Sequence, residues 1–412
     1  MTNELKNVPE LRFPEFDGEW EENSLENINS FSKGKGISKK DISEEGTPCI
    51  LYGELYTTYN FMVNKVKSKT LLDTKNLVRG YKNQILIPSS GETPMDIATA
   101  AVINTDDKLL LGGDINILTP KEKHDGKFIT LSINGKYKRE LSKFAQGKSV
   151  VHLYNNDIKK LKVKFPLNIK EQQKIGDFFS KLDRQIELEE RKLAKLEEQK
   201  KGYMQKIFSQ KLRFKDANGN DYSGWKPEQL NSIFTKYQNT IYLDDNEEYK
   251  RISISNKGKI THRDIALGKV IGRKRQYLID LQKYPDTLTF IRQGVFLGGI
   301  GFVPNSLDGH IVTENMPLLS MSEKYNKRFL TYLFVSETYY KSVIVKNLPT
   351  GSAQKALHEK DWLQSFVNIP IYSEQEKIGD FFNQLDKLIE KQSDKTELLK
   401  KRKKSFLQKM FV

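Results

Sequence analysis

A segment of seventeen residues occurs twice in this sequence. EQQKIGDFFSKLDRQIE begins at Glu171, EQEKIGDFFNQLDKLIE begins at Glu374, and twelve of the seventeen positions are identical. The phrase LRFPEFDGEW, which begins at Leu11, likewise returns as LRFKDANGNDYSGW from Leu212. The period of about 203 residues is far too long for a solenoid repeat. The sequence therefore predicts a tandem duplication, in which each copy is a variable block followed by a helix.

Each repeated segment opens a long stretch with one narrow apolar stripe at heptad spacing. A long helix with such a stripe needs a partner, and the two copies offer matching stripes. We predict that the helices pair within the chain, and two like domains related by a pseudo-twofold make the pairing antiparallel. The stripes alone fix no direction, and the alternative is that each stripe packs on its own domain. The predicted pairing residues are Ile175, Phe179, Leu182, Ile186, Leu193, Leu196, Ile378, Phe382, Leu385, Ile389, Leu399 and Phe406.

The two blocks between the helices have a β-rich texture. Short runs such as QILIP, AAVIN and INILTP alternate with Gly, Pro, Asn and Asp turns, and the second block has the same texture. Helical patches lie near Gly126–Phe144 and Asn326–Val345. We predict an α+β fold for each block, built on a mainly antiparallel sheet with short helices. The expected boundaries are residues 1–170 and 211–373 for the domains, and 171–210 and 374–412 for the helices.

The net charge of +15 makes an anionic partner the first expectation, and the charge is not confined to one tail. The single cysteine, Cys49, excludes an intramolecular disulfide and a cysteine-rich metal site, which fits a reducing cytoplasm. The first residues have no apolar core typical of a signal peptide, and no run approaches the length of a membrane span.

The sequence carries no catalytic constellation. Gly147-Lys148-Ser149 resembles the end of a P-loop, but the required first glycine is replaced by Ser142. A base methyltransferase would need an Asn/Asp-Pro-Pro-aromatic motif, and the chain has no Pro-Pro pair. Clustered carboxylates with a lysine, as in metal-dependent nucleases, are also missing. The five histidines are scattered in the sequence, so we predict no metal site.

Binding therefore remains as the activity to be explained. Gly272–Tyr277 gathers three cations, an amide and an aromatic ring, and such side chains grip phosphates and read base edges. The alternative for each basic segment is an ordinary solvated cluster. The candidate DNA-binding residues are Lys33, Lys35, Lys39, Ser89, Ser90, Glu92, Thr93, Lys148, Arg273, Lys274, Arg275, Gln276, Tyr277, Gln354 and Lys355.

This order of segments resembles the specificity (S) subunit of Type I restriction-modification systems. The resemblance covers essentially the whole chain and rests on the two LRF phrases, the QILIPSSGET run, the GFVPNSLDGHIVTENMPLL run and the repeated E-Q-x-K-I-G-x-F-F helix. It implies two target recognition domains, separated by two long helices that form an intramolecular antiparallel coiled coil. Each domain would read one half of a bipartite, asymmetric DNA site, and the helices would fix the gap.

The resemblance also implies partners and cofactors. Double-stranded DNA, two modification (methyltransferase) subunits and two restriction (translocase and nuclease) subunits are the expected partners, with no membrane. This chain is expected to be non-catalytic and to hold no cofactor, whereas S-adenosylmethionine, ATP and magnesium belong to the partner subunits. The alternatives are a specificity subunit whose partner fuses methylase and nuclease, a protein-assembly scaffold, and an enzyme with a cryptic site.

Overall fold

The computed structural model describes residues 7–348 and 356–412, which divide into two compact units. Unit 1 comprises Met1–Arg191 and Asp394–Val412, and unit 2 comprises Lys192–Ser393. Each unit thus contains one variable domain, the first part of the helix that follows that domain, and the last part of the other helix. Each long helix therefore contributes to both units.

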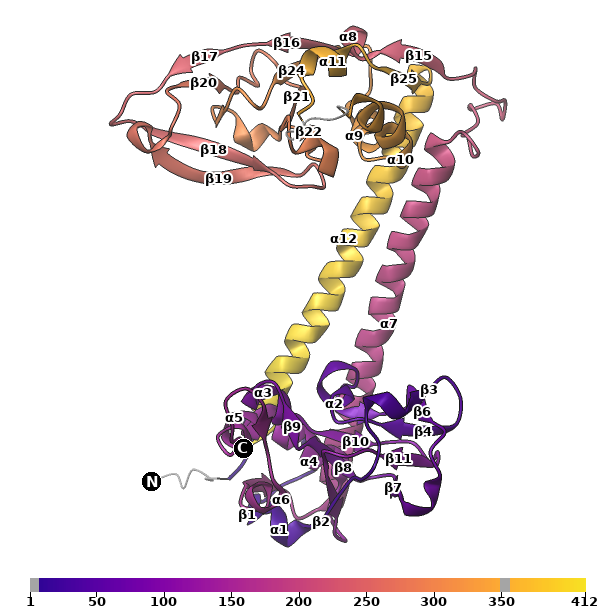
Figure 1. Cartoon of the computed structure of the whole chain (residues 1–412), viewed down its shortest axis with the longest axis vertical. Helices are drawn as coiled ribbons and strands as arrows, with labels where there is room; N and C mark the ends of the chain where they lie inside the picture. Colours follow the sequence, from indigo (N-terminus) through magenta and orange to yellow (C-terminus); the bar gives the residue numbers. More distant parts are fainter. Residues whose placement is uncertain (1–6, 349–355) are drawn as a thin grey trace. The chain divides into compact units, whose positions relative to one another are not determined.

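The domain of unit 1 is built on two five-stranded sheets (Figure 1). The first has the order β2 (Asn29–Lys33), β12 (Ile115–Pro120), β8 (Ile85–Pro88), β10 (Ala101–Ile103) and β5 (Met62–Val63). The second has the order β3 (Ile42–Ser43), β6 (Ser68–Thr70), β4 (Thr47–Ile50), β11 (Leu109–Leu111) and β7 (Val78–Gly80). Most strand pairs are antiparallel, as predicted, although β5 and β4 pair in parallel with β10 and β11.

Shorter elements complete this domain. Two strand pairs join β1 (Glu21–Ser24) to β14 (Lys162–Phe165), and β9 (Ser90–Gly91) to β13 (Val151–His152). The short helices are α1 (Leu25–Ile28), α2 (Glu54–Thr57), α3 (Pro94–Ile97), α4 (Gly126–Ser132), α5 (Lys138–Ser142) and α6 (Asn155–Ile158). All four residues of β8 are buried, because both faces of this strand are covered, and this explains its continuous apolar run.

The domain of unit 2 repeats part of this plan. A four-stranded sheet has the order β16 (Phe234–Tyr237), β24 (Leu318–Met321), β21 (Thr287–Phe290) and β22 (Ile300–Phe302), and β15 (Lys226–Gln229) pairs with β25 (Phe366–Ile369). The other sheet has its own order: β17 (Thr240–Tyr242), β20 (Arg275–Leu278), β23 (Ile311–Val312), β18 (Glu248–Ile254) and β19 (Ile260–Leu267). The short helices are α8 (Leu230–Ile233), α9 (Lys327–Phe334), α10 (Glu337–Tyr339) and α11 (Glu359–Leu363).

The long helices are α7 (Ile169–Phe208) and α12 (Tyr372–Lys409). In unit 1, Leu182 and Ile186 of α7 form a buried cluster with Leu399 of α12. Asp183 pairs with Lys403 at 2.5 Å, and Glu190 pairs with Lys400 at 3.0 Å. Numbers rise along one helix as they fall along the other, so the two segments run antiparallel.

The helix segments of unit 2 make the corresponding contacts. Lys200 of α7 pairs with Asp386 of α12 at 2.5 Å, and Tyr203 packs edge-on against Phe381. Adding the period of about 203 to Asp183 gives Asp386, and adding it to Lys200 gives Lys403. The ion pair of Asp183 with Lys403 in unit 1 therefore recurs in unit 2 as the pair of Asp386 with Lys200, with the helices exchanged. This is the arrangement that a duplicated, antiparallel pair of helices produces.

The other predicted pairing residues fall into two groups. Ile175 and Phe179 lie in the core of the first domain, and Ile378 and Phe382 lie in the core of the second. The first turns of each helix thus pack on the domain that precedes them. Four of the remaining five are half-buried side chains along the helices: Leu193, Leu196, Leu385 and Ile389. Phe406 is half-buried too, and packs on Phe178.

The end of each helix is inserted into the domain of the other copy. Phe411, just after α12, packs on Trp20, Phe128 and Phe179 in unit 1. Phe208, at the end of α7, packs in the same way on Phe329 and other rings in unit 2. Each core therefore contains residues from both repeats, and neither repeat on its own supplies a complete unit.

Candidate nucleic-acid interface

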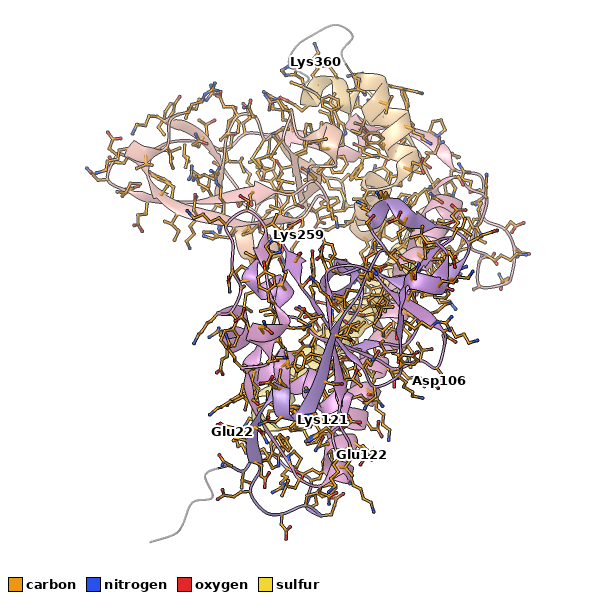
Figure 2. All side chains as sticks on the ribbon, turned by 60° about the horizontal axis from the view of Figure 1, so that its bottom comes forward. Glu22, Asp106, Lys121, Glu122, Lys259 and Lys360 are labelled. Atoms are coloured by element: carbon orange, nitrogen blue, oxygen red, sulfur yellow. The ribbon has the colours of Figure 1, made fainter. Side chains whose placement is uncertain are left out.

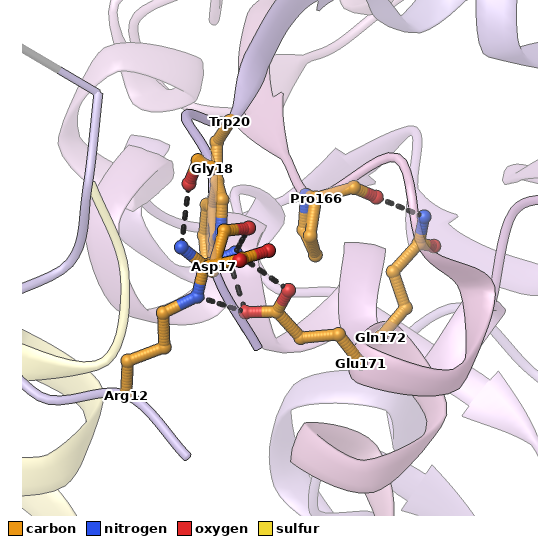
Figure 3. Close-up of polar contacts among 7 residues, drawn as sticks. All are labelled: Arg12, Asp17, Gly18, Trp20, Pro166, Glu171 and Gln172. Carbon is orange, nitrogen blue, oxygen red and sulfur yellow. Dashed lines mark hydrogen bonds and ion pairs between the residues drawn. The ribbon is translucent and has the colours of Figure 1, made fainter. Parts of the chain in front are cut away.

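The repeated Glu-Gln pair fastens each domain to its helix. Arg12 donates from Nε and Nη2 to the two carboxylate oxygens of Glu171, both at 2.8 Å, and Trp20 Nε1 donates to Oε1 at 3.3 Å (Figure 3). The Glu171 side chain is 1% exposed. Gln172 Nε2 donates to the carbonyl oxygen of Pro166 at 2.8 Å. The leading segment and the last strand of the domain are thus both tied to the first turn of α7.

The second copy repeats this junction. Arg213 donates to both carboxylate oxygens of Glu374, and Gln375 donates to the carbonyl oxygen of Pro370 at 2.9 Å. Glu374 is fully buried, so its charge depends on Arg213 for compensation. The segment repeated in the sequence therefore encodes a rigid domain-to-helix joint, on which two different binding surfaces are built.

A polar turn follows β8 in unit 1 and gathers several of the candidate residues. Ser89 Oγ donates to Asp114 Oδ1 at 3.4 Å, and Lys33 Nζ lies 3.8 Å from the same oxygen. Ser90 Oγ lies 3.0 Å from His152 Nδ1. Ser89 and Ser90 are buried, so in this structure their hydroxyl groups are not displayed at the surface where DNA could contact them. They hold the turn, while the half-exposed Lys33 beside Asp114 is accessible to a ligand.

The neighbouring candidates flank this turn. Lys148 is exposed in the loop that leads into β13, the strand paired with β9 at the turn. Glu92 is exposed next to Thr93, whose hydroxyl caps α3 by accepting a hydrogen bond from the amide of Asp96. Lys35 and Lys39 are exposed beyond Gly34, where a Cβ would lie 2.0 Å from the Gly112 carbonyl oxygen, so only glycine allows this close backbone approach.

The structure adds a groove in unit 1 that the sequence did not single out. It has a volume of about 470 Å³, and its lining includes Ser32, Lys75, Arg79, Tyr81 and Gln84. Tyr81 is 63% exposed, although it is a large aromatic residue. Lys82 follows it and pairs at 2.8 Å with Asp106, which Figure 2 labels. An exposed aromatic ring between cations suits contact with a nucleic acid. The sequence Arg-Gly-Tyr-Lys at residues 79–82 is the pattern from which this site could have been predicted.

The basic segment of unit 2 divides into exposed and buried residues. Arg273 and Arg275 both approach Glu314 at 3.4 Å, and their side chains are 70% and 48% exposed. Lys274 is also exposed and pairs with Asp245. Gln276 and Tyr277 differ from the prediction, because β20 turns both side chains into the domain and leaves them 1% and 6% exposed.

Gln276 nevertheless lines a cavity of about 370 Å³ with Arg251, Arg263 and several aliphatic side chains. Near it, the β18–β19 hairpin carries Lys257 and Lys259 in its exposed turn, and Figure 2 labels Lys259. These two lysines are not among the candidates predicted from the sequence. Two further candidates, Gln354 and Lys355, lie outside the described residues.

The turn after β21 in unit 2 corresponds to the turn after β8. The Arg292 amide donates to the Asn315 carbonyl, as the Ser89 amide donates to the Asp114 carbonyl in unit 1. The side chains differ completely, because Arg292 and Lys236 both bind the buried carboxylate of Glu359. The two domains thus share a backbone framework and present different groups on it.

Within residues 7–348 and 356–412, no cluster of three His, Cys, Asp or Glu side chains is arranged to hold a metal ion. In the same part of the chain, no helix combines the length and apolarity needed to span a bilayer.

Comparison with known proteins assigns this architecture. The model of the Type I restriction modification DNA specificity domain matches residues 17–198. The specificity subunit of the Type I restriction enzyme MjaVIII from Methanocaldococcus jannaschii is 24% identical over 422 residues, covering 98% of this chain and 94% of that protein. The chain is therefore similar to a Type I specificity subunit along nearly its whole length, and residues 17–198 match the specificity-domain model.

Two solved structures share the fold of this chain. The S subunit of the Type I restriction-modification system of M. genitalium has a TM-score of 0.60 at 17% identity, over 98% of this chain and 99% of that one. A chain from a structure on complex assembly and conformational transition of the type I R-M system has a TM-score of 0.54 at 13% identity, over 95% and 97% of the two chains. At these identities the likeness concerns the fold.

Proposed function

We propose that each variable domain reads one half of a bipartite, asymmetric DNA site, and that α7 and α12 set the gap between the halves. The observation that carries this proposal is the pairing of a shared framework with different surfaces. The Ser89 and Arg292 turns have the same backbone hydrogen bonds, yet one presents Lys33 and the other surrounds Glu359 with cations. A protein that recognised two copies of one sequence would have no use for that divergence.

The exposed cations supply the affinity in this proposal. Lysine and arginine on each domain neutralise phosphates and release counterions, which makes binding dependent on salt. In unit 1 these are Lys33, Lys35, Lys39 and Lys148, together with the groove residues Arg79 and Tyr81. In unit 2 they are Arg273, Lys274 and Arg275, with Lys257 and Lys259 of the hairpin. Base recognition would come from the arginines and from polar groups at the rims of the groove in unit 1 and the Gln276 cavity in unit 2.

The proposal extends to partners that provide the chemistry. Two modification subunits, which bind S-adenosylmethionine and methylate adenine, and two restriction subunits, which use ATP and magnesium, would dock on the helices and adjoining domain surfaces in the cytoplasm. A partner that fuses methylase and nuclease is the second candidate, and this chain's residues fit either. A scaffold that binds only proteins is disfavoured by the exposed cations on both domains.

Exchange of one domain tests the proposal. A host expressing this chain with its modification partner is compared, by methylome sequencing, with a host whose chain carries residues 226–370 from another specificity subunit. We expect one half of the methylated motif to change while the other half and the gap stay the same. A change in both halves, or methylation without any bipartite motif, would rule the proposal out. The purified chain alone should neither methylate nor cut DNA.

A further inference from the structure

Two histidines that are 48 residues apart in the sequence meet in unit 2. His262 lies on β19, and His310 immediately precedes β23. Nδ1 of His262 is 3.1 Å from Nε2 of His310, and the two rings are nearly perpendicular, at 83°. Because one neutral ring must donate and the other accept at this distance, at least one nitrogen presents a lone pair to the other ring.

The surroundings of His310 fix which nitrogen that is. Its Nδ1 lies 3.4 Å from the carbonyl oxygen of Asp308, so Nδ1 carries the proton and Nε2 carries the lone pair. The His310 amide and carbonyl are hydrogen bonded to Leu307 and Ile279, and the residue is only 5% exposed. A histidine whose other ring nitrogen donates to a backbone carbonyl is already oriented as histidine ligands of metals are.

We propose that His262 and His310 bind one divalent transition-metal ion. Two bonds of about 2.0–2.1 Å at a tetrahedral angle place their nitrogens roughly 3.3 Å apart, close to the distance of 3.1 Å in the structure. Binding requires the proton of His262 to move from Nδ1 to Nε2, and both rings to turn slightly. Imidazole nitrogens select zinc, copper or nickel, whereas magnesium and calcium prefer oxygen ligands.

The remaining coordination positions would be filled by water. The pair borders an open hollow of about 490 Å³, whose lining includes Thr261 and Ser306. Lys250 also lines this hollow, and its positive charge opposes the ion. Only two protein ligands and a nearby ammonium group make this a site of moderate affinity, well below a structural zinc site. An ion bound there would join β19 to the turn before β23.

Calorimetric titration of the full, tag-free chain with Cu²⁺, Ni²⁺, Zn²⁺ and Mg²⁺ tests the site. We expect saturable binding of one ion, strongest for Cu²⁺, and no binding of Mg²⁺. His262→Ala, at an exposed position, should weaken binding at least about tenfold, or 1.4 kcal/mol. His310→Asn should do the same, because its amide keeps the donor to Asp308 and loses the ligand. With Zn²⁺, the NMR signals of His262 should report transfer of the proton to Nε2.

His358→Ala is the matched control, because His358 is an exposed histidine in the same domain. It should leave the affinity unchanged. No binding of any of the three transition metals up to about 1 mM, or binding that survives both His262→Ala and His310→Asn, would overturn the proposal. Loss of binding in His358→Ala would do so as well. None of these outcomes bears on DNA recognition, which is measured separately.

Discussion

Arg12 and Glu171 form a bidentate ion pair that ties the leading segment of the first domain to the first turn of α7, and Arg213 and Glu374 form the same pair in the second copy. The glutamates are 1% and 0% exposed. The carboxylate in each copy has therefore left water entirely, and the arginine opposite is its compensation.

Arg12→Ala should destabilise unit 1 by about 3 kcal/mol, because it leaves a buried carboxylate without its counter-charge. The double variant Arg12→Ala with Glu171→Gln should cost clearly less than the sum of the single changes, since it removes the charge as well. Urea unfolding is followed by tryptophan fluorescence in a Trp225→Phe, Trp362→Phe background. The signal then comes from Trp20 alone, the only tryptophan of unit 1. Strictly additive costs would contradict the importance of this pair.

Lys174→Ala provides the control for that experiment. Lys174 pairs with Glu15 in the same region, but both side chains are more than 40% exposed. Exposed pairs contribute from zero to about 1 kcal/mol. A loss as large as that of Arg12→Ala would mean that the local segment, and not the buried charge, determines the effect.

The duplication made the fold predictable, because a repeated heptad stripe has few ways to bury itself. The helical patches at Gly126–Phe144 and Asn326–Val345 are helical for a local reason: Asp125 and Asn326 cap the first helix of each. What the stripes could not show is that Phe208 and Phe411 fill the opposite domain's core. That exchange depends on the antiparallel pairing, which the stripes left open.

The candidate interface was less predictable than the fold. Composition identifies basic segments, but it does not say which side chains a strand turns inward. Gln276 and Tyr277 follow two exposed arginines in the sequence and are nevertheless buried in β20. Conversely, Arg79 and Tyr81 line one groove with Ser32 only because two sheets bring distant segments together. The His262–His310 pair was missed for the same reason.

Arg273→Ala and Arg275→Ala should each weaken duplex binding and reduce the slope of log affinity against log salt by about 0.9. Both guanidinium groups are exposed and share Glu314 as their only ion-pair partner in the described part of the chain. Glu314→Gln should act in the opposite direction, because it releases two cations at once. Fluorescence anisotropy across a series of salt concentrations measures all three variants.

Lys341→Ala is the matched control for charge in the same unit, because Lys341 pairs with Glu337 within one helical turn, away from the basic segment. It removes one cation and should leave the salt slope unchanged. Equal slopes for Arg273→Ala, Arg275→Ala and the parent chain would show that these arginines do not contact phosphates.

Asp183 gives the stability of unit 1 a dependence on pH. Burial raises the pKa of this carboxyl group, although Lys403 acts in the opposite direction. Its Oδ2 is buried without a hydrogen-bond partner among the described residues. In the unfolded chain the Asp183 carboxyl group keeps its ordinary pKa of 3.8, so it ionises at a lower pH than in the folded protein. Stability should therefore fall as the pH rises from 3.8 through the raised pKa, and then level off.

Asp183→Asn should remove this part of the pH dependence, as measured by urea midpoints between about pH 3 and pH 7. Asp386→Asn, at the equivalent position in unit 2, is a contrasting variant. Asp386 accepts from Tyr332 at 2.7 Å and pairs with Lys200, so its replacement should lower stability at neutral pH. If the plots of urea midpoint against pH stay parallel for the parent chain and Asp183→Asn, Asp183 is not the source of the pH dependence.

Lengthening the helices should change the gap between half-sites and leave the bases unchanged. One heptad adds about 10.5 Å and completes almost two turns, so each domain keeps nearly the same orientation about the helix axis. Because Asp183 faces Lys403 and Lys200 faces Asp386, an insertion within 190–202 of α7 needs a matching insertion within 387–399 of α12. The gap should grow by about three base pairs.

An insertion in α7 alone tests whether a defined gap requires the two helices to keep matching lengths. Without a matching heptad, the ion pairs on one side of the insertion lose their register, and we expect poor assembly or a mixture of gaps. Inserting four residues into both helices adds about 6 Å but rotates the domains by roughly 40°, so recognition should weaken even though the helices still pair. Methylome sequencing reads the gap in every case. A gap that stays constant after the matched heptad insertion would mean that the helices do not set the spacing.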